Sequence, residues 1–376
     1  MDTLPLIQKI IQGSDREHPA DAVLRSTLKA QRALSREEGS EISRAVFAFY
    51  RWRGWLRPDD ALASQLEQAS ALARKYALAP SAFKDDELIR YSLPSWVTEV
   101  AEITPAFARA LQQEPRIWLR ARPGQGREVA ETLWDCSPFG KGPLADVLEY
   151  KGTKDLFRTR QFHAGHFELQ DLSSIAVGLV CAPKPGETWW DACAGEGGKT
   201  LHLADLMQNR GLIWATDRAE WRLRRLRLRT ARAHVFNYRS ALWNAEGKLP
   251  TKTVFDGVLV DAPCSGIGTW HRNPHARWTS TRQDVSELAD VQKRLLHRAS
   301  SLVKPGGKLA YATCTVTREE TTGVAQEFEK SHPDFLPLVT NHPLDAHLSA
   351  SPVFQFWPQD FGGNGLFVAV WRRAVV

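Results

Sequence analysis

Short apolar segments alternate with longer amphipathic segments along the second half of the chain. Apolar strands that alternate with helices form a parallel sheet with helices on both faces. We therefore predict a doubly wound α/β domain over residues 161–376. Its expected strands are 187–192, 211–216, 235–242, 254–261, 306–313 and 366–372, and its expected helices are 198–208, 218–233, 284–302 and 317–330.

The first part of the chain has a different pattern. Apolar residues recur there at helical spacing, and turn residues such as Gly13-Ser14-Asp15 separate the segments. This pattern predicts an all-helical domain over residues 1–80, with helices at 4–12, 21–33, 36–56 and 61–76. Helices around one expected strand, 117–121, predict a small α+β domain over residues 81–160 that leads into the doubly wound domain.

A glycine-rich turn follows the first expected strand of the doubly wound domain, and glycines there let backbone N–H groups approach a ligand closely. A phosphate-binding P-loop would need glycine at position 193, where the chain has cysteine. A dinucleotide fingerprint would need glycine at position 200, where it has threonine. With both of these motifs excluded, the pattern still has an Asp at the end of each of the first two strands, Asp191 and Asp217. The carboxylate of Asp217 can accept hydrogen bonds from both hydroxyls of a ribose. The pattern predicts a nucleoside cofactor, most simply S-adenosylmethionine.

Two cysteines come just after expected strands. Cys264 lies in Asp261-Ala-Pro-Cys-Ser-Gly, and Cys314 lies in Tyr311-Ala-Thr-Cys-Thr. Ligands of an open α/β sheet bind beyond the carboxyl ends of its strands, so we expect both thiols to face one cleft. Two thiols in a cleft indicate covalent chemistry. The other three cysteines, Cys136, Cys181 and Cys193, lack such a context and are expected to be structural.

Together these motifs resemble those of the RsmB/NOP (Fmu/Sun) family of S-adenosylmethionine-dependent RNA cytosine-5 methyltransferases. Asp-Ala-Pro-Cys-Ser-Gly with a downstream Thr-Cys is a specific combination, whereas either piece alone would be weak. The resemblance implies a Rossmann-like methyltransferase sheet with an antiparallel last strand, a shortened NusB-like helical domain and S-adenosylmethionine as cofactor. It is carried by residues 191–199, 217, 261–277, 311–314 and 365–369 and, less strongly, by the N-terminal helices.

The resemblance also implies roles for the two thiols. A thiolate that adds to C6 of cytosine makes C5 nucleophilic enough to take a methyl group, after which a base removes the C5 proton and the thiol is eliminated. In the family, the Thr-Cys thiol attacks and the Pro-Cys thiol assists release, which points to Cys314 as nucleophile and Cys264 as release residue. We expect Asp261 to accept a hydrogen bond from the cytosine N4 amino group, and Lys199 to be functional as well.

The residues expected to bind the cofactor are Asp191, Ala192, Cys193, Ala194, Gly195, Glu196, Gly197, Gly198, Lys199, Asp217, Arg222, Asn244 and Asp261. Two of them depart from the family pattern. Gly195-Glu196 stands where members usually have Ala-Pro, which adds a negative charge. Asn244 stands where an Asp commonly contacts adenine, although its amide oxygen can still accept a hydrogen bond. The second departure predicts a lower cofactor affinity than usual.

Basic residues are in modest excess, 49 Lys and Arg against 43 Asp and Glu, which favours a polyanionic partner. The segment after Cys264 contains four residues that we expect to contact the phosphate backbone of RNA or a flipped nucleotide. They are Arg272, His275, Arg277 and Trp278. A second basic feature is interpreted as a solvated helix face that steers RNA by its field. It is a stripe of Arg218, Arg222, Arg225, Arg229 and Arg232.

The expected substrate is RNA, and the NusB-like resemblance favours ribosomal over transfer RNA. Two interpretations of the N-terminal helices stay open, an RNA-binding domain and a cap that only packs on the catalytic domain. The alternative functions are a tRNA cytosine-5 methyltransferase and a catalytically weak ribosome assembly factor, whereas Thr-Cys disfavours a DNA methyltransferase. Five irregularly spaced cysteines indicate a reducing compartment. We expect a monomeric cytoplasmic protein with no metal and no membrane segment.

Overall fold

The computed structural model describes residues 3–31, 33–246, 248 and 251–375. The chain forms two compact units. The helical unit consists of Met1–Pro115 with Ser265–Val285, and the sheet unit consists of Arg116–Cys264 with Ser286–Val376. The three predicted domains, 1–80, 81–160 and 161–376, stay a prediction beside this division into two units. Among the described residues, no helix combines the length and the apolar composition needed to cross a membrane.

The helical unit contains the four helices predicted at the N-terminus and three more. A capping box starts the third one, because Ser35 accepts from the backbone N–H of Glu38 while the Glu38 carboxylate accepts from that of Ser35. Its core includes Trp52, which is completely buried. The helices are α1 (Leu4–Gln12), α2 (Ala20–Ala30), α3 (Arg36–Trp52), α4 (Leu62–Leu78), α5 (Asp85–Tyr91), α6 (Val97–Val100) and α7 (Pro105–Gln112).

The segment Ser265–Val285 joins this unit although it follows β8 of the sheet unit in sequence. Arg277 is completely buried and donates hydrogen bonds to the carbonyls of Ser92, at 2.9 Å, and Leu111. The indole N–H of Trp278 donates to the carbonyl of Tyr50 at 2.7 Å. A buried guanidinium needs acceptors, so these carbonyls fix the segment among the helices.

The sheet unit is built around a large sheet with the strand order β10-β12-β9-β8-β5-β6-β7, and β11 pairs with β12. The strands from β5 to β9 are parallel, and β12 runs antiparallel to β9. This arrangement confirms the predicted fold class. The strands are β5 (Thr188–Asp191), β6 (Leu212–Asp217), β7 (Tyr238–Leu242), β8 (Phe255–Asp261), β9 (Val303–Thr313), β10 (Phe335–Pro337), β11 (Val353–Phe356) and β12 (Leu366–Arg373).

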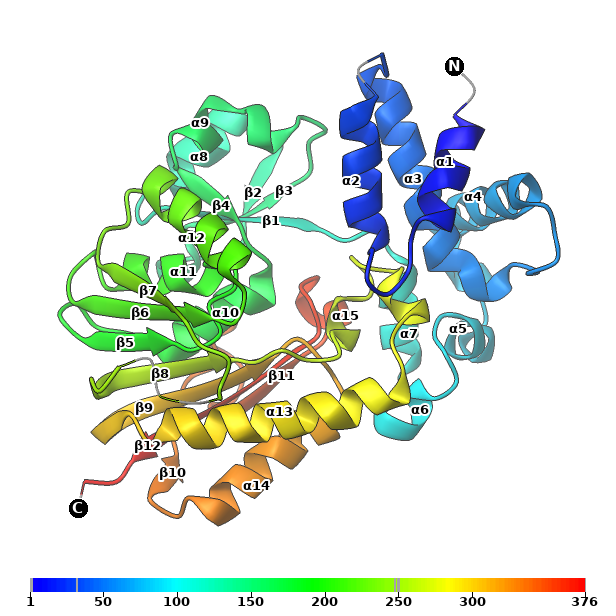
Figure 1. Ribbon diagram of the computed structural model, residues 1–376. Helices are drawn as coiled ribbons and strands as arrows, with labels where there is room; N and C mark the ends of the chain where they lie inside the picture. Colours follow the sequence, from blue (N-terminus) through cyan, green and yellow to red (C-terminus); the bar gives the residue numbers. More distant parts are fainter. Residues whose placement is uncertain (1–2, 32, 247, 249–250, 376) are drawn as a thin grey trace. The chain divides into compact units, whose positions relative to one another are not determined.

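Helices cover both faces of the large sheet (Figure 1). Side chains alternate along β8, so that Leu259 packs in the core on one face and Val258 packs in the core on the other. The helices α10 (Leu172–Cys181) and α11 (Gly198–Leu206) lie on the first face, and α13 (Arg282–Ser300) and α14 (Val324–Ser331) lie on the second. Two further helices are α12 (Glu220–Arg232) and α15 (Pro358–Phe361).

A small antiparallel sheet belongs to the same unit and has the order β2-β3-β1-β4. Arg120 donates to Gln170 at 2.6 Å, and both Arg120 and Arg122 form ion pairs with Asp205 of α11. These buried pairs attach the small sheet to the doubly wound part of the unit. Its elements are β1 (Ile117–Ala121), β2 (Cys136–Pro138), β3 (Val147–Tyr150), β4 (Phe167–Leu169), α8 (Gly126–Leu133) and α9 (Arg160–His163).

Candidate active site

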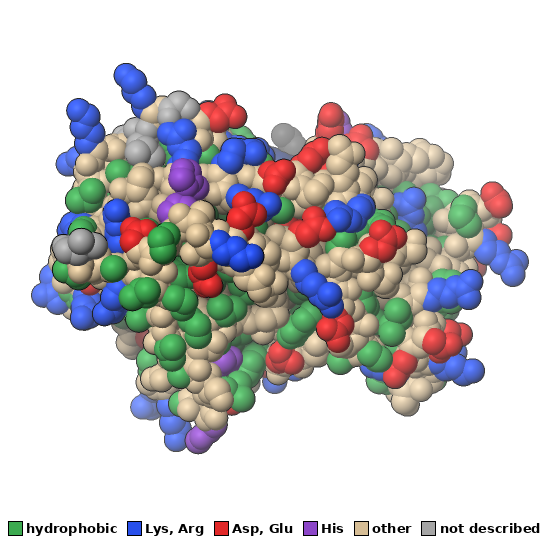
Figure 2. All heavy atoms as spheres, turned by 90° about the horizontal axis from the view of Figure 1, so that it is seen from below, with side chains coloured by type: hydrophobic (Ala, Val, Ile, Leu, Met, Phe, Trp, Pro, Cys, Tyr) green, Lys and Arg blue, Asp and Glu red, His purple; other side chains and the backbone are tan. Residues whose placement is uncertain are grey.

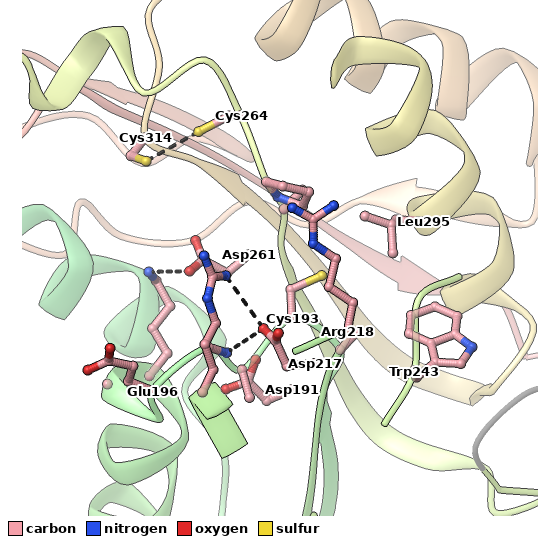
Figure 3. A pocket seen from close by; sticks show the side chains of 18 of the residues that line it. Asp191, Cys193, Glu196, Asp217, Arg218, Trp243, Asp261, Cys264, Leu295 and Cys314 are labelled. Atoms are coloured by element: carbon pink, nitrogen blue, oxygen red, sulfur yellow. Dashed lines mark hydrogen bonds and ion pairs between the residues drawn. The ribbon is translucent and has the colours of Figure 1, made fainter. Parts of the chain in front are cut away.

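A cavity of about 400 Å³ lies beyond the carboxyl ends of the central strands of the sheet unit (Figure 3). Small-molecule sites have volumes of this order, roughly 300–1,000 Å³. The cavity is lined by Ser174, 191–196, Gly198, Lys199, Asp217, Arg218, Arg222, Trp243, Asn244, 261–264, Val291, Leu295 and Cys314. Except for Gly197, every residue that the sequence predicted for catalysis or cofactor binding is therefore among its lining residues.

The strand order explains why these residues meet. Asp191 at the end of β5 pairs with Leu259 of β8 on one side and with Ala215 of β6 on the other. Asp261, at the end of β8, pairs with Ala312 of β9. Because parallel strands end at the same edge of a sheet, the turns that follow β5, β6, β8 and β9 converge on one cavity.

The turn after β5 depends on glycine at two positions. Gly195 and Gly197 have positive φ angles of 56° and 88°, a region that side chains rarely adopt. The N–H of Gly195 donates to the Asp217 carboxylate at 3.0 Å, which ties this turn to the end of β6. Gly197 itself lies beside the cavity and shapes the turn, since a Cβ there would come within 2.8 Å of Leu226.

Asp217 is nearly buried and organises two backbone segments. One carboxylate oxygen accepts from Gly195, and the other accepts from the N–H of Ala219 at 2.8 Å. The Arg222 guanidinium lies 3.8 Å from the same carboxylate. Each carboxylate oxygen has two acceptor sites, so Asp217 keeps capacity for ligand hydroxyls.

Asp191 is completely buried, and only one of its two carboxylate oxygens has a hydrogen-bond partner among the described residues. Its Oδ2 accepts from the Thr200 hydroxyl at 2.6 Å, whereas its Oδ1 has no hydrogen-bond partner among the described residues. Burial raises the pKa of Asp191 to about 7. A buried carboxylate oxygen without a partner at a cavity wall suits a ligand that brings a donor, above all a cationic one.

Lys199 and Asp261 form an ion pair in which the Nζ–Oδ2 distance is 2.7 Å (Figure 3). Burial works to lower the pKa of Lys199, but the charge of Asp261 and the hydrogen bond to it outweigh burial and raise that pKa. Lys199 therefore stays charged within the cavity. Its ammonium group also interacts electrostatically with Cys314.

The thiols of Cys264 and Cys314 lie side by side, with their sulfur atoms 3.2 Å apart (Figure 3). The two residues come from the turns after β8 and β9, as expected from their place in the sequence. Burial raises the pKa of Cys136 to about 11 and that of Cys181 to about 12, and it also raises the pKa of Cys193. These three thiols stay protonated and unreactive, because the thiolate is the nucleophile.

Carboxylates neutralise much of the arginine stripe on α12. Arg225 pairs with Glu196 at 3.3 Å, so the extra negative charge of the turn has a partner. Arg229, at 2.9 Å, and Arg232 both pair with Glu168, a nearly buried residue of β4. The interpretation of this stripe as a solvated face is therefore wrong for Arg229 and Arg232, whereas Arg225 is exposed as that interpretation expects.

The structure adds cavity residues that the sequence reasoning missed. Arg218 follows β6 directly, and Trp243 precedes Asn244 just after β7. Val291 and Leu295 are four residues apart on α13, the helix that packs on the second face of the sheet, and both line the cavity. Their helical spacing signals a buried face, but nothing in it distinguishes a face toward a ligand from a face toward the core. The remaining missed residues are Ser174, Ala262 and Pro263.

The four expected RNA contacts belong to the helical unit. His275 and Arg277 are buried there, and His275 packs edge-on against Tyr50 with ring centroids 4.7 Å apart. The prediction that these two residues contact RNA is wrong, because their side chains are occupied inside the unit. Trp278 is partly buried and donates to a backbone carbonyl, whereas Arg272 is exposed. No group of three or more His, Cys, Asp or Glu side chains is placed to hold a metal ion in the described part of the chain.

Comparisons with known proteins identify relatives of this chain. The chain is 32% identical over 303 residues to a probable ribosomal RNA small subunit methyltransferase B of Synechocystis sp., which covers 76% of this chain and 68% of that protein. It is 31% identical over 267 residues to the 28S rRNA (cytosine(4447)-C(5))-methyltransferase of Homo sapiens, which covers 66% of this chain and 33% of that protein. The chain thus spans about a third of the human relative's length.

A solved structure shows the same fold. The crystal structure of PH0851 has a TM-score of 0.78 and 23% sequence identity, and the match covers 98% of this chain and 97% of that chain. The family model for 16S rRNA methyltransferase RsmB/F matches residues 178–372, more than half of the chain. This match and the Synechocystis relative show that the chain belongs to the RsmB/F family of 16S rRNA methyltransferases.

Proposed function

We propose that this protein transfers a methyl group from S-adenosylmethionine to C5 of a cytosine in ribosomal RNA, through a covalent bond between Cys314 and C6. One observation carries the proposal. Two thiols 3.2 Å apart face the same cavity as a lysine–carboxylate pair and two strand-end aspartates. Thiol addition, base recognition and nucleoside binding need these groups within reach of one another.

The residues around the cavity fit the cofactor. Asp217 has acceptor capacity for the ribose hydroxyls, and the unpartnered oxygen of Asp191 suits the α-ammonium group. The Asn244 amide can accept from the adenine amino group, between apolar surfaces from Trp243 and Leu295. When bound, S-adenosylmethionine supplies a methyl group on a sulfonium, which is the electrophile of the reaction.

Lys199 and Asp261 prepare the site for nucleophilic attack. The ammonium group of Lys199 interacts electrostatically with Cys314, so its positive charge lies near the sulfur that attacks. The sulfur then forms a bond to C6, and the electron pair of the C5–C6 double bond becomes available at C5. Asp261 accepts from Lys199 through Oδ2, which leaves the other carboxylate oxygen to accept from the cytosine N4 amino group.

Cys264 acts after methyl transfer. Once C5 carries the methyl group, a base takes the C5 proton, and the electron pair of that C–H bond re-forms the C5–C6 double bond and expels the Cys314 thiolate. The sulfur of Cys264 lies next to that of Cys314 and so close to the bond that must break. We assign Cys264 to assisting this elimination.

Ribosomal RNA is the proposed substrate because of the relatives' names. One is a probable ribosomal RNA small subunit methyltransferase, and the other is a 28S rRNA cytosine-C5 methyltransferase. The family model is also that of 16S rRNA methyltransferases. Within this class, small-subunit RNA is the proposed target.

Alanine variants of the two thiols test the proposal. Cys314→Ala is expected to abolish methyl transfer and any covalent adduct, because C5 stays unreactive without addition at C6. Cys264→Ala is expected to methylate once and stall with RNA attached through Cys314. The measurement is a denaturing gel after incubation with S-adenosylmethionine and unmodified small-subunit rRNA transcribed in vitro, and the stalled complex is a slow band.

Cys136→Ala is the matched control, because this thiol lies on β2 of the small sheet and outside the cavity. It is expected to turn over like wild type with no band. A band from Cys314→Ala and none from Cys264→Ala would reverse the two roles. Wild type without methyl transfer to any RNA, and no band from either variant, would contradict the proposed function and favour an assembly factor.

A further inference from the structure

A second, larger groove adjoins the cavity on the sheet unit. Its volume is about 1360 Å³, and it lies between the start of α12, the turn after β7 and the second half of α13. Arg218, Arg222, Asn244 and Val291 line both the groove and the cavity. The groove has more than three times the volume of the cavity, so S-adenosylmethionine would not fill it.

The groove is strongly basic. Four arginines line it, Arg218, Arg222, Arg294 and Arg298, against the single carboxylate of Glu246. Arg218 and Arg294 are exposed and make no ion pair with the described residues. Figure 2 shows many Lys and Arg side chains at the left end of the face that it presents. Across the middle of that face, Asp and Glu side chains are mixed with Lys and Arg side chains.

The rest of α12 makes a clear contrast. Further along this helix, Arg225 pairs with Glu196, Arg227 pairs with Glu220 at 2.6 Å, and Arg229 pairs with Glu168. The arginine-rich composition of the helix therefore does not by itself give a basic surface. At the groove, Arg222 lies 3.8 Å from the Asp217 carboxylate, whereas Arg218 and Arg294 have no carboxylate partner among the described residues.

An exposed tryptophan lies among these charges. Trp221 is 50% exposed and lines the groove. The guanidinium groups of Arg222 and Arg225 lie 5.3 and 5.8 Å from the centroid of its ring. Cationic side chains bind phosphates, and an exposed aromatic ring stacks on an unstacked base. Proteins that bind single-stranded nucleic acid combine these two features.

We propose that this groove binds a single-stranded stretch of the substrate RNA, with arginines on its phosphates and Trp221 stacked on a base. The proposal rests on the proposed function and adds where the RNA is held. A small anion would leave most of the groove empty, and an acidic peptide would bring no planar base for Trp221. A single-stranded stretch of the substrate RNA uses the charge, the volume and the exposed ring together.

Two variants separate the predicted phosphate and base contacts. Arg294→Gln removes one charge at a residue that lines the groove but not the cavity. It is expected to reduce the slope of log affinity against log salt concentration by about 0.7–0.9, the value for one lost phosphate contact. Trp221→Ala is expected to weaken binding by roughly 5- to 150-fold, the equivalent of about 1–3 kcal/mol for one stacked base, with the slope unchanged.

The measurement is a fluorescence titration of the full chain with small-subunit rRNA transcribed in vitro, between 50 and 200 mM salt. The matched control is Arg227→Gln, which removes an arginine of α12 that pairs with Glu220 and does not line the groove. It is expected to match wild type in affinity and slope. All three variants are expected to bind S-adenosylmethionine in calorimetry as wild type does, with KM for RNA raised in Arg294→Gln and Trp221→Ala only.

Unchanged affinity and slope in both groove variants would overturn the proposal, as would an equal loss in the Arg227→Gln control. The same titrations separate this proposal from the proposed function. Wild type that binds the RNA through the groove but transfers no methyl group would disprove the function and leave the groove intact. Wild type that methylates the RNA while the groove variants bind normally would disprove the groove alone.

Discussion

The two compact units each bury a cation, but they stabilise it in different ways. Lys199 of the sheet unit follows the glycine turn after β5 and pairs with the carboxylate of Asp261, the last residue of β8. Arg277 of the helical unit has no carboxylate partner within the described part of the chain and donates to backbone carbonyls from several separate segments. The sheet unit thus places its charge at strand ends, which the sequence marks by motifs, whereas the helical unit places its charge by the packing of segments that no motif links.

This difference shows in the direction of each pKa shift. Burial lowers the pKa of Arg277, and nearby Arg51 lowers it further. For Lys199, Asp261 outweighs burial and raises the pKa. A cation with a carboxylate partner can serve in catalysis, where its charge acts on a reacting group. A cation surrounded by carbonyls supplies hydrogen bonds that hold chain segments together.

The largest effect is expected for Arg277→Met. Removal of the guanidinium leaves the buried carbonyls of Ser92 and Leu111 without donors, at a cost of about 3–5 kcal/mol in the free energy of unfolding of the helical unit. Hydrogen exchange of α3 and α7 measures the loss. The control is Arg74→Met on α4, an exposed arginine, which is expected to stay within about 0.5 kcal/mol. Equal protection in the two variants would show that Arg277 does not hold the unit together.

An intermediate effect is expected for Lys199→Met, which should affect chemistry more than folding. Without the ammonium group, Cys314 loses its nearby positive charge, and kcat should fall about 100-fold or more, as for the loss of one electrostatic contact to a reacting group. Single-turnover methylation measures this change. Lys304→Met is the control, because Lys304 forms a similar pair with Asp256, at 2.8 Å, away from the cavity. An equal fall in both variants would mean that Lys199 is only structural.

The smallest effect is a pH dependence caused by Asp191. Its pKa is raised by burial to about 7, so the folded state holds a proton that the unfolded state loses at lower pH. Its contribution to stability is therefore fully present below about pH 4 and is lost as pH rises to about 7. Tm of wild type minus Tm of Asp191→Asn, measured from pH 4.5 to 8, is expected to fall over this range and then level off. A difference that does not change with pH would contradict the raised pKa.

Most of the doubly wound sheet could be predicted because each of its main strands carries its own apolar signal. The strands at 187–192, 211–216 and 254–261 agree with β5, β6 and β8 within a residue or so. The short strands β10 and β11 were missed, since both depend on pairing with β12 rather than on a pattern of their own. The strand β9 begins at Val303, before a Pro-Gly-Gly sequence that normally signals a turn.

The cavity could be predicted for a similar reason, while the charge pairs around it could not. Strand-end positions converge in any parallel sheet, so Asp191, Asp217, Cys264 and Cys314 could be placed together before the structure was known. Arg229 and Arg232 are paired with Glu168, which is 61 residues or more away in the sequence. No spacing rule links residues so far apart.

The sequence by itself determined the order of strands and helices, the glycine turn and the two thiols, because each depends on backbone preferences or on neighbouring residues. The tertiary structure decided which charges are exposed. It buried Arg277 among carbonyls, neutralised most of α12 and left the groove at Arg218 and Arg294 positive. The physical reason is that charge–charge energy and desolvation depend on distance and burial in space, which packing sets and which a linear pattern does not contain.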